Sequence, residues 1–277
     1  MDRRTFFAAG LVSLLAGCAT PGRRAAAPVT AGAGGSLPVA PNGNPPTSNA
    51  APGQMLPPAG LPFTGPSMTV TQLPPGSDAR LALTIDDGID PAVVAAYLDV
   101  VERTGQQLTF FPNGIYPAWT THADRLRPLV RSGQVQLGNH TWSHPDLTRL
   151  PDTRVLAELR RNHVFLARTF GVDPRPWWRP PYGAHDARVD ALAASLGYTR
   201  VTLWAGSLGD ARLLTSPVLM VQARRWLTGG RIVIGHANHP TVIALLPQIE
   251  ELLRVRNLEL ITLARAADDA ARNLGHT

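Results

Sequence analysis

The stretch Leu81-Ala82-Leu83-Thr84-Ile85-Asp86-Asp87-Gly88 decides the fold of this 277-residue chain. Its run of apolar and β-branched residues predicts a buried strand, and two carboxylates stand where that strand ends. Asp90 and Pro91 follow as the expected N-cap and first residue of a helix that continues to Arg103. A strand that leads through a short loop into a helix is the repeating unit of parallel α/β folds.

The same alternation continues to the end of the chain. Besides the first strand and helix, we expect strands at 107–111, 135–138, 177–178, 199–204, 231–234 and 258–261, and helices at 117–132, 152–170, 186–196, 217–227, 240–254 and 263–273. Alternating strands and helices predict a parallel sheet, most simply closed into a barrel. In such barrels the functional side chains lie at the C-terminal ends of the strands.

Residues 1–18 are interpreted as an export signal and are left out of the fold. Arg3 and Arg4 precede an apolar stretch that ends at Ala16, and this stretch is shorter than the ~20 residues of a membrane-spanning helix. The run Leu15-Ala16-Gly17-Cys18 resembles a bacterial lipoprotein box. Lipidation of Cys18 would anchor the exported protein on the outer face of the cytoplasmic membrane. A plain secretory signal is the alternative, and the twin-arginine and general secretory routes both fit.

The composition divides the rest of the chain in two. Residues 19–66 are rich in Pro, Gly and Ala, which predicts a disordered tether that spans roughly 40 Å. Residues 67–277 form the expected catalytic domain. The net charge is +6 without any basic run that has interleaved aromatics, so we expect no nucleic-acid partner. The single cysteine excludes an internal disulfide, and a monomer is expected.

Two polar motifs indicate a metal site. Asp86 and Asp87 end the first strand, where Gly88 allows the chain to turn both carboxylates into one pocket. His140 and His144 follow the third strand at a spacing of four, which places both imidazoles on one face of a turn or short helix. Together they offer an Asp-His-His ligand set with open positions for water. Taken singly, the motifs also fit a helix N-cap pair and two surface histidines.

Two further motifs supply candidate groups for acid–base chemistry. Arg179, in Arg-Pro-Pro-Tyr, could form a charge-assisted pair with Asp86, while the backbone N–H of Tyr182 could face an oxyanion. His236 ends a buried strand and suits a general acid. A structural turn is the alternative interpretation of the Arg179 motif.

In this order and spacing, the four motifs resemble those of the polysaccharide deacetylases of carbohydrate esterase family 4. The resemblance extends over about 79–263 and implies a distorted (β/α) barrel of about seven parallel strands. It implies that Asp86 is the catalytic base and that Asp87, His140 and His144 bind a divalent metal. It further implies the following roles: Arg179 positions the base, Tyr182 donates its N–H, His236 is the acid, and Asp210 tunes it.

The implied reaction is hydrolysis of an amide bond, which removes N-acetyl groups from an extracellular GlcNAc-containing glycan such as peptidoglycan or a chitin-like oligosaccharide and releases acetate. Zinc is the expected metal, with cobalt, nickel or manganese as alternatives. The chain departs from the family at Ile85, where Phe is usual, and at Ala211, where a Trp usually walls the groove. Trp204 or Trp142 could replace that wall. An O-acetyl esterase of the xylan type and a non-catalytic glycan-binding lipoprotein are the alternative functions.

Overall fold

The computed structural model describes residues 67–274. The predicted export signal over 1–18, the Cys18 anchor and the tether over 19–66 lie outside these residues. Within the described part, no helix combines the length and the apolar character that a membrane span requires.

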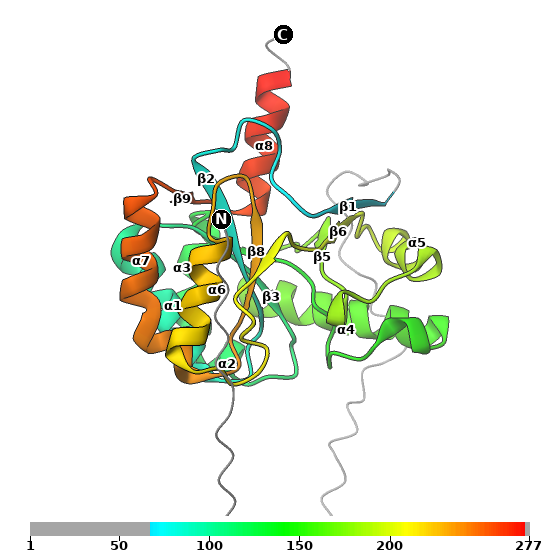
Figure 1. Cartoon of the computed structure of the whole chain (residues 1–277). Coiled ribbons are helices and arrows are strands. Elements are labelled where there is room, and N and C mark those ends of the chain that lie inside the picture. The colour runs from blue at the N-terminus through cyan, green and yellow to red at the C-terminus, as the bar shows by residue number, and fades with distance from the viewer. Residues whose placement is uncertain (1–66, 275–277) are drawn as a thin grey trace, which may run out of the picture. The chain divides into compact units, whose positions relative to one another are not determined.

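The described residues alternate between strands and helices (Figure 1). The strands are β1 Met68–Val70, β2 Arg80–Asp87, β3 Leu108–Pro112, β4 Val135–Leu137, β5 Trp177–Trp178, β6 Arg200–Thr202, β7 Gly206–Ser207, β8 Ile232–His236 and β9 Glu259–Leu260. The α-helices are α1 Pro91–Thr104, α2 Ala118–Thr121, α3 Ala123–Arg131, α4 Asp152–Phe170, α5 Ala187–Ser195, α6 Ser216–Trp226, α7 Leu246–Val255 and α8 Leu263–Leu274. Short 3₁₀ helices are η1 Leu147–Arg149, η2 Pro181–Gly183 and η3 Pro240–Leu245.

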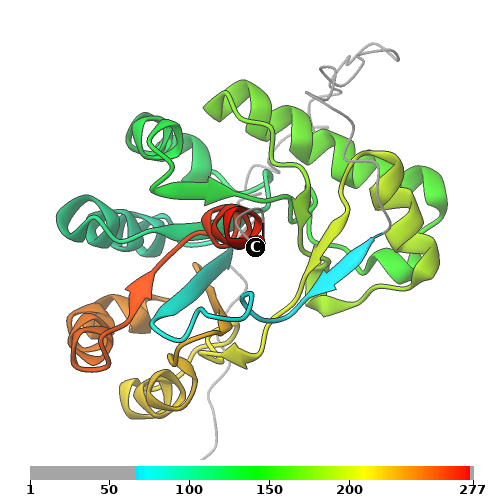
Figure 2. The same ribbon diagram turned by 90° about the horizontal axis from the view of Figure 1, so that it is seen from above.

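The strands form a distorted (β/α) barrel, as predicted. One sheet has the order β4-β3-β2-β8-β7 with β9 beside the start of β2, and a second has the order β1-β6-β5; the pairs within both are parallel. A parallel bridge between Asn139 and Trp178 joins β4 to β5. At the other edge, β1 and the segment after it connect the two sheets. Val70 accepts the N–H of Leu203, and Gln72 pairs with Arg231 next to β8. Helices surround the strands, and α8 lies end-on over the middle (Figure 2).

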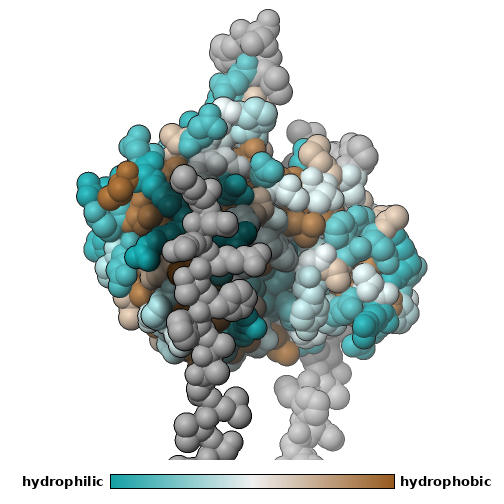
Figure 3. Space-filling view, viewed as in Figure 1, coloured by the Kyte–Doolittle hydropathy of each residue, from teal (hydrophilic) through white to brown (hydrophobic). Residues whose placement is uncertain are grey.

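Alternation along β2 separates the packing layer from the interior of the barrel. Leu81, Leu83 and Ile85 are buried in the large cluster that α1 and the neighbouring helices complete. Ala82 belongs instead to the cluster inside the barrel, which Leu263 of α8 closes at the N-terminal ends of the strands. Asp86 has the same parity as Ala82, so the pleat aims its carboxylate into the mouth of the barrel. The visible surface outside these cores is mostly hydrophilic, with separate hydrophobic patches (Figure 3).

Most predicted elements are confirmed, including α1 with its cap: the Asp90 carboxylate accepts the N–H of Ala92. The single helix predicted over 117–132 is wrong, because the structure breaks it at His122. The hydroxyls of Thr120 and Thr121 both donate to the Pro117 carbonyl and so compete with the helical pattern there.

The helix predicted over 240–254 is also wrong in its first part, which is the 3₁₀ helix η3. The α-helix α7 begins only at Leu246, and Pro247 explains the late start because its ring nitrogen has no hydrogen to donate to an earlier turn. Strands β1 and β7 were not predicted. Each has at most three residues and shows no periodic pattern.

Candidate active site

The predicted residues gather at one end of the barrel, where β2, β4, β5, β7 and β8 finish. They line a cavity of about 450 Å³. Its lining comprises Asp86, Asp87, Ile89, Tyr116, His140, His144, Pro180, Tyr182, Gly183, Trp204, Ser207, Ala211, Ile234, His236 and Asn238. Arg179 and Asp210 lie behind this lining, both buried.

Asp87 reaches the cavity because of a backbone turn. By alternation its side chain would follow Ile85 to the outside of the barrel. Its φ of 70° is left-handed and redirects the carboxylate towards His140 and His144. The indole N–H of Trp119 holds this turn by donating to the Asp87 carbonyl at 2.7 Å. A Cβ on Gly88 would lie 2.3 Å from that indole nitrogen, so only glycine fits after Asp87.

His140 and His144 come from a loop and not from the short helix or turn face that the spacing of four suggested. Thr141 and His144 have left-handed φ values of 70° and 60°. The Thr141 hydroxyl accepts the N–H of His144, and Glu158 of α4 accepts both the N–H and the hydroxyl of Ser143. Thr141 and Ser143 therefore hold the loop.

A buried layer of asparagines supports this loop from below. Asn139 accepts the N–H of Thr141 and donates to the hydroxyl of Tyr198, while Asn113 donates to the carbonyls of His140 and Thr141. Asn162 of α4 joins the two by donating to Asn139 and accepting the N–H of Gly114. These asparagines carry no motif of their own, and sequence reasoning missed them.

Asp87, His140 and His144 have the geometry of a metal centre. Each offers one ligand atom, and the three atoms lie within 4.8 Å of one another. Asp87 Oδ1 is 3.5 Å from the Nε2 atom of each histidine. Ligands about 2.0–2.1 Å from a tetrahedral ion are separated by about 3.4 Å, so the spacing fits. Asp87 Oδ1 is also buried without a hydrogen-bond partner, which is costly unless a cation binds there.

Burial and the mutual charges of its groups shift the pKa values of this centre. Burial lowers the pKa of His140, but the charges of Asp86 and Asp87 raise it more. Burial raises the pKa of Asp87, but the two adjacent imidazoles, His140 first and then His144, outweigh it and hold this pKa well below its usual range. Burial, together with the charge of His140, lowers the pKa of His144 to about 4. The His140 Nδ1–H donates to the Arg179 carbonyl at 2.8 Å, which leaves Nε2 to face the ligand position.

Asp86 is held by an ion pair that crosses between the two sheets. Arg179 is fully buried and donates to Asp86 Oδ1 at 2.6 Å, and its Nε donates to the Thr202 carbonyl. The guanidinium also lies over the ring of Phe111, at 4.3 Å from its centroid. Asp86 Oδ2 faces His140 Nε2 at 3.5 Å, so one carboxylate oxygen is fixed and the other looks towards the metal centre.

His236 and Asp210 form the second pair. The His236 Nδ1–H donates to Asp210 Oδ1 at 3.0 Å, and Asp210 is buried. Burial lowers the pKa of His236, but the hydrogen bond to Asp210 and the charges of Asp86, Asp210 and Asp87 raise it more. The net effect is a pKa above the ordinary value, which favours the protonated form of His236.

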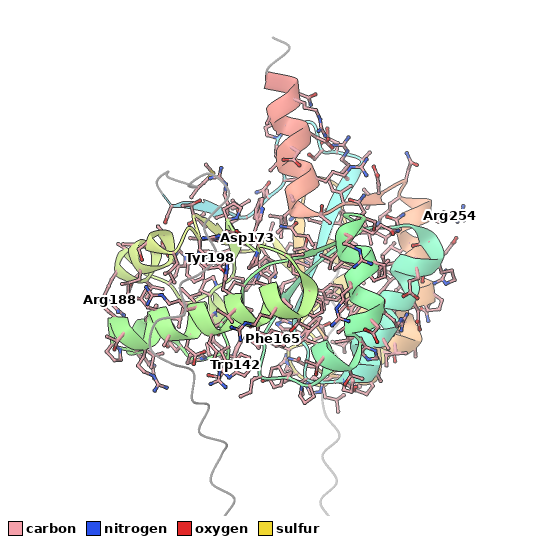
Figure 4. The ribbon with its side chains drawn as sticks, turned by 180° about the vertical axis from the view of Figure 1, so that it is seen from behind. Trp142, Phe165, Asp173, Arg188, Tyr198 and Arg254 are labelled. Carbon is pink, nitrogen blue, oxygen red and sulfur yellow. The ribbon has the colours of Figure 1, made fainter. Side chains whose placement is uncertain are left out.

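Tyr182 and Trp204 shape the opening of the cavity. Tyr182 has a left-handed φ of 61°, its side chain is mostly exposed, and its ring packs edge-on to His144. Its backbone N–H has no acceptor among residues 67–274 and is free for a ligand. Trp204 lines the cavity, as one of the two predicted replacements for the missing wall. The other replacement is wrong: Trp142 is not among the lining residues, and it packs against Phe165 (Figure 4) and under the guanidinium of Arg161.

Comparisons with known proteins agree with this geometry. Residues 74–201 match the sequence model of the family described as polysaccharide deacetylase. The chain contains a polysaccharide deacetylase domain. It is 27% identical to a chitin deacetylase of Arthroderma benhamiae, with 71% of this chain and 54% of the relative covered. Identity is also 27% to a peptidoglycan-N-acetylglucosamine deacetylase of Listeria monocytogenes, with 71% and 41% covered.

The fold is shared with solved structures of the same carbohydrate esterase family. One is a family 4 pseudoenzyme of Bacillus anthracis, with a TM-score of 0.63, 18% identity, and coverage of 72% of this chain and 68% of that one. This chain spans about half the length, or less, of the curated relatives described above. The deacetylase match ends at residue 201, so it contains Asp86 and the ligand set but not Asp210 or His236. The placement of those two residues therefore rests on the geometry alone.

Proposed function

We propose that this protein is a metal-dependent hydrolase that removes N-acetyl groups from a GlcNAc-containing polysaccharide and releases acetate. One observation carries the proposal: a base, an acid and a three-residue metal centre open into one cavity, each already oriented by a buried partner. Asp86 is oriented by Arg179, His236 by Asp210, and the His140 imidazole by a backbone carbonyl.

The residues of the cavity divide the hydrolysis between them. Asp86 Oδ2 accepts a proton from water, and the resulting hydroxide adds to the acetyl carbonyl carbon. The free N–H of Tyr182 donates to the oxygen that becomes negative. His236 Nε2 then gives its proton to the amide nitrogen as the carbon–nitrogen bond breaks, which leaves an amine and acetate.

A divalent ion held by Asp87, His140 and His144 would supply Lewis-acid polarisation of the carbonyl and a lower pKa of the attacking water. The ligand set of one carboxylate and two imidazoles suits zinc, with cobalt, nickel or manganese as alternatives. Zinc is our first choice because Asp87 Oδ1 lies 3.5 Å from each histidine Nε2, close to the ~3.4 Å that separates the ligands of a tetrahedral ion.

The lining of the cavity supports a neutral acetylated sugar as the substrate. Apart from the aspartates and histidines of the site, none of its lining residues is charged. Tyr116, Tyr182 and Trp204 offer aromatic surfaces for sugar rings. The chitin and peptidoglycan deacetylases among the relatives are consistent with this class. We place the enzyme in the cell envelope, exported and lipid-anchored through Cys18, on the strength of the N-terminal sequence alone.

Acetate release tests the proposal. The full-length protein is incubated with a chitooligosaccharide and with peptidoglycan, before and after chelation and after zinc is added back. We expect release that the chelator abolishes and the metal restores. Protein that binds metal but releases no acetate from either glycan would contradict an N-deacetylase.

An O-acetyl esterase is the second candidate, and Ala211 favours it. A methyl group stands where the family usually has an indole, so the cavity wall is open on that side. The same base and acid would cleave an ester. Acetylated xylan assayed beside the N-acetyl glycans separates the two. A protein inactive on all of them, with metal bound, would be a non-catalytic glycan-binding protein.

A further inference from the structure

Asn238 touches the metal centre and has no role in the function proposed so far. It lies two residues after His236, in the loop that follows β8, and it lines the cavity. Its side-chain N–H donates to Asp87 Oδ2 at 2.6 Å. We propose that Asn238 is a positioning residue that fixes Asp87 as a ligand through one oxygen; this rests on the proposed metal-dependent function.

The contact assigns different tasks to the two oxygens of Asp87. Oδ2 is occupied by the amide of Asn238, whereas Oδ1 lies 3.5 Å from each of the two imidazole nitrogens and has no hydrogen-bond donor. A carboxylate with one oxygen held in this way presents a single oxygen to a cation. Single-oxygen binding leaves more coordination positions open for water and for the substrate carbonyl.

The backbone places Asn238 firmly. The preceding residue, Ala237, donates its N–H to the Asp86 carbonyl at 3.0 Å and accepts the N–H of Asp90 at 2.9 Å. The loop after β8 is thus joined both to the end of β2, which carries Asp87, and to Asp90 in the loop that follows β2. Because His236 pairs in register with Asp86, this one junction fixes the positions of the acid, the base and the metal ligand together.

A packing role does not account for an asparagine here. The Asn238 Oδ1 atom is buried without a hydrogen-bond partner, which is unfavourable for folding. Leucine has a similar size and would fill the same volume without that cost. The amide is therefore explained by what its N–H does to Asp87. Partners of this kind orient metal ligands and typically change metal affinity by 10–100-fold.

The test compares Asn238→Leu with the parent in the full-length protein. Isothermal titration of the metal-free proteins with Zn²⁺ and Co²⁺ gives Kd, and the visible absorption of bound Co²⁺ reports the ligand geometry. We expect Asn238→Leu to raise Kd by about 10–100-fold and to change the Co²⁺ spectrum. The melting temperature of the metal-free protein should not fall. Asn238→Ala serves the same comparison if the leucine variant does not fold.

His239→Ala is the matched control, since the neighbouring His239 makes no hydrogen bond or ion pair within residues 67–274. It should bind metal like the parent. Unchanged Kd and Co²⁺ spectrum in Asn238→Leu would overturn the positioning role while leaving the proposed function intact. If Asn238→Leu binds metal more weakly but the parent protein deacetylates no glycan, the positioning role is supported and the proposed reaction is rejected. A parent that binds neither ion would overturn both.

Discussion

The two sheets contribute unequally to the site. The larger sheet supplies Asp86, Asp87 and His236 directly from the ends of β2 and β8, which pair along five residues and are buried by helices. The smaller sheet supplies Arg179 and Tyr182 from the turn that follows the two-residue strand β5. The reacting groups thus stand on the long strands, and the groups that orient them or donate an N–H stand on the short ones.

The contacts between the two sides explain how such short strands position anything. Arg179 reaches across with its guanidinium to Asp86 and with its carbonyl to His140. The loop with His140 and His144 lies where the two sheets meet, beside the Asn139–Trp178 bridge. Precision on the smaller side therefore depends on bonds made to the larger side. Substitutions on each side test this division.

The largest effect is expected in the loop where the two sheets meet. His140→Ala removes a proposed metal ligand, and we expect metal binding to be lost and activity to fall by on the order of 10³-fold or more. Metal content of the purified variant and acetate release are the two measurements. His122→Ala is the control, because His122 lies outside the cavity on the outer helices. Stoichiometric zinc in His140→Ala would contradict the ligand assignment.

On the larger sheet, Asp86→Asn should separate binding from turnover. The amide keeps nearly the shape of the carboxylate but cannot accept the proton of water, so we expect acetate release to fall by about 10²–10⁴-fold. Metal content should remain at the parent level, because Asp87 and both histidines are intact. A metal-replete variant with a rate near that of the parent would refute Asp86 as the base.

On the smaller sheet, Arg179→Met breaks the crossing ion pair. It leaves Asp86 buried without its cation, which destabilises such sites by about 3–5 kcal/mol. We expect a lower melting temperature and a slower rate, with the substrate KM little changed. Arg254→Met is the matched control: its pair with Glu251 is exposed, so little stability should be lost. Equal effects of the two substitutions would show that the crossing pair has no special importance.

The acid pair offers a smaller, pH-dependent test. The Asp210 carboxylate raises the pKa of His236 and keeps the acid protonated to higher pH. In Asp210→Asn this pKa falls, so the alkaline side of the rate profile should move to lower pH. Rates measured across pH with metal saturating give the shift. If the alkaline side of the rate profile stays at the same pH, Asp210 does not set the pKa of the acid His236.

The smallest effect is expected at the rim. Ala211→Trp restores the usual family residue in the cavity lining, and we expect activities on N-acetyl and O-acetyl substrates to change by less than about tenfold. The ratio of acetate released from a chitooligosaccharide and from acetylated xylan is the measurement. A ratio that shifts towards the amide would show that the open wall favours esters. An unchanged ratio would show that Ala211 does not select the substrate.

Local sequence was sufficient where one element sets its own boundaries. The helix over 152–170 has the predicted ends, because Gly171 takes the left-handed conformation that stops it. Asp90 caps α1 as expected, and β2, β3 and β8 follow from apolar runs that only a buried strand accommodates. The motifs predicted most residues of the cavity, because each motif lies at the end of such a strand.

The tertiary structure decided what depends on a distant partner. Asp87, at the end of β2, enters the cavity only because Trp119 of helix α2 holds its left-handed backbone conformation. The four-residue spacing of His140 and His144 is used in a loop fixed by buried asparagines, and the spacing alone does not distinguish a loop from a helix. Asn238 can be assigned a role only through its contact with Asp87, 151 positions earlier in the chain. Local backbone preference and burial, both readable from the amino-acid order, account for the elements and the chemical groups. Folding decided the directions of those groups, because they are set by hydrogen bonds between segments far apart in the chain.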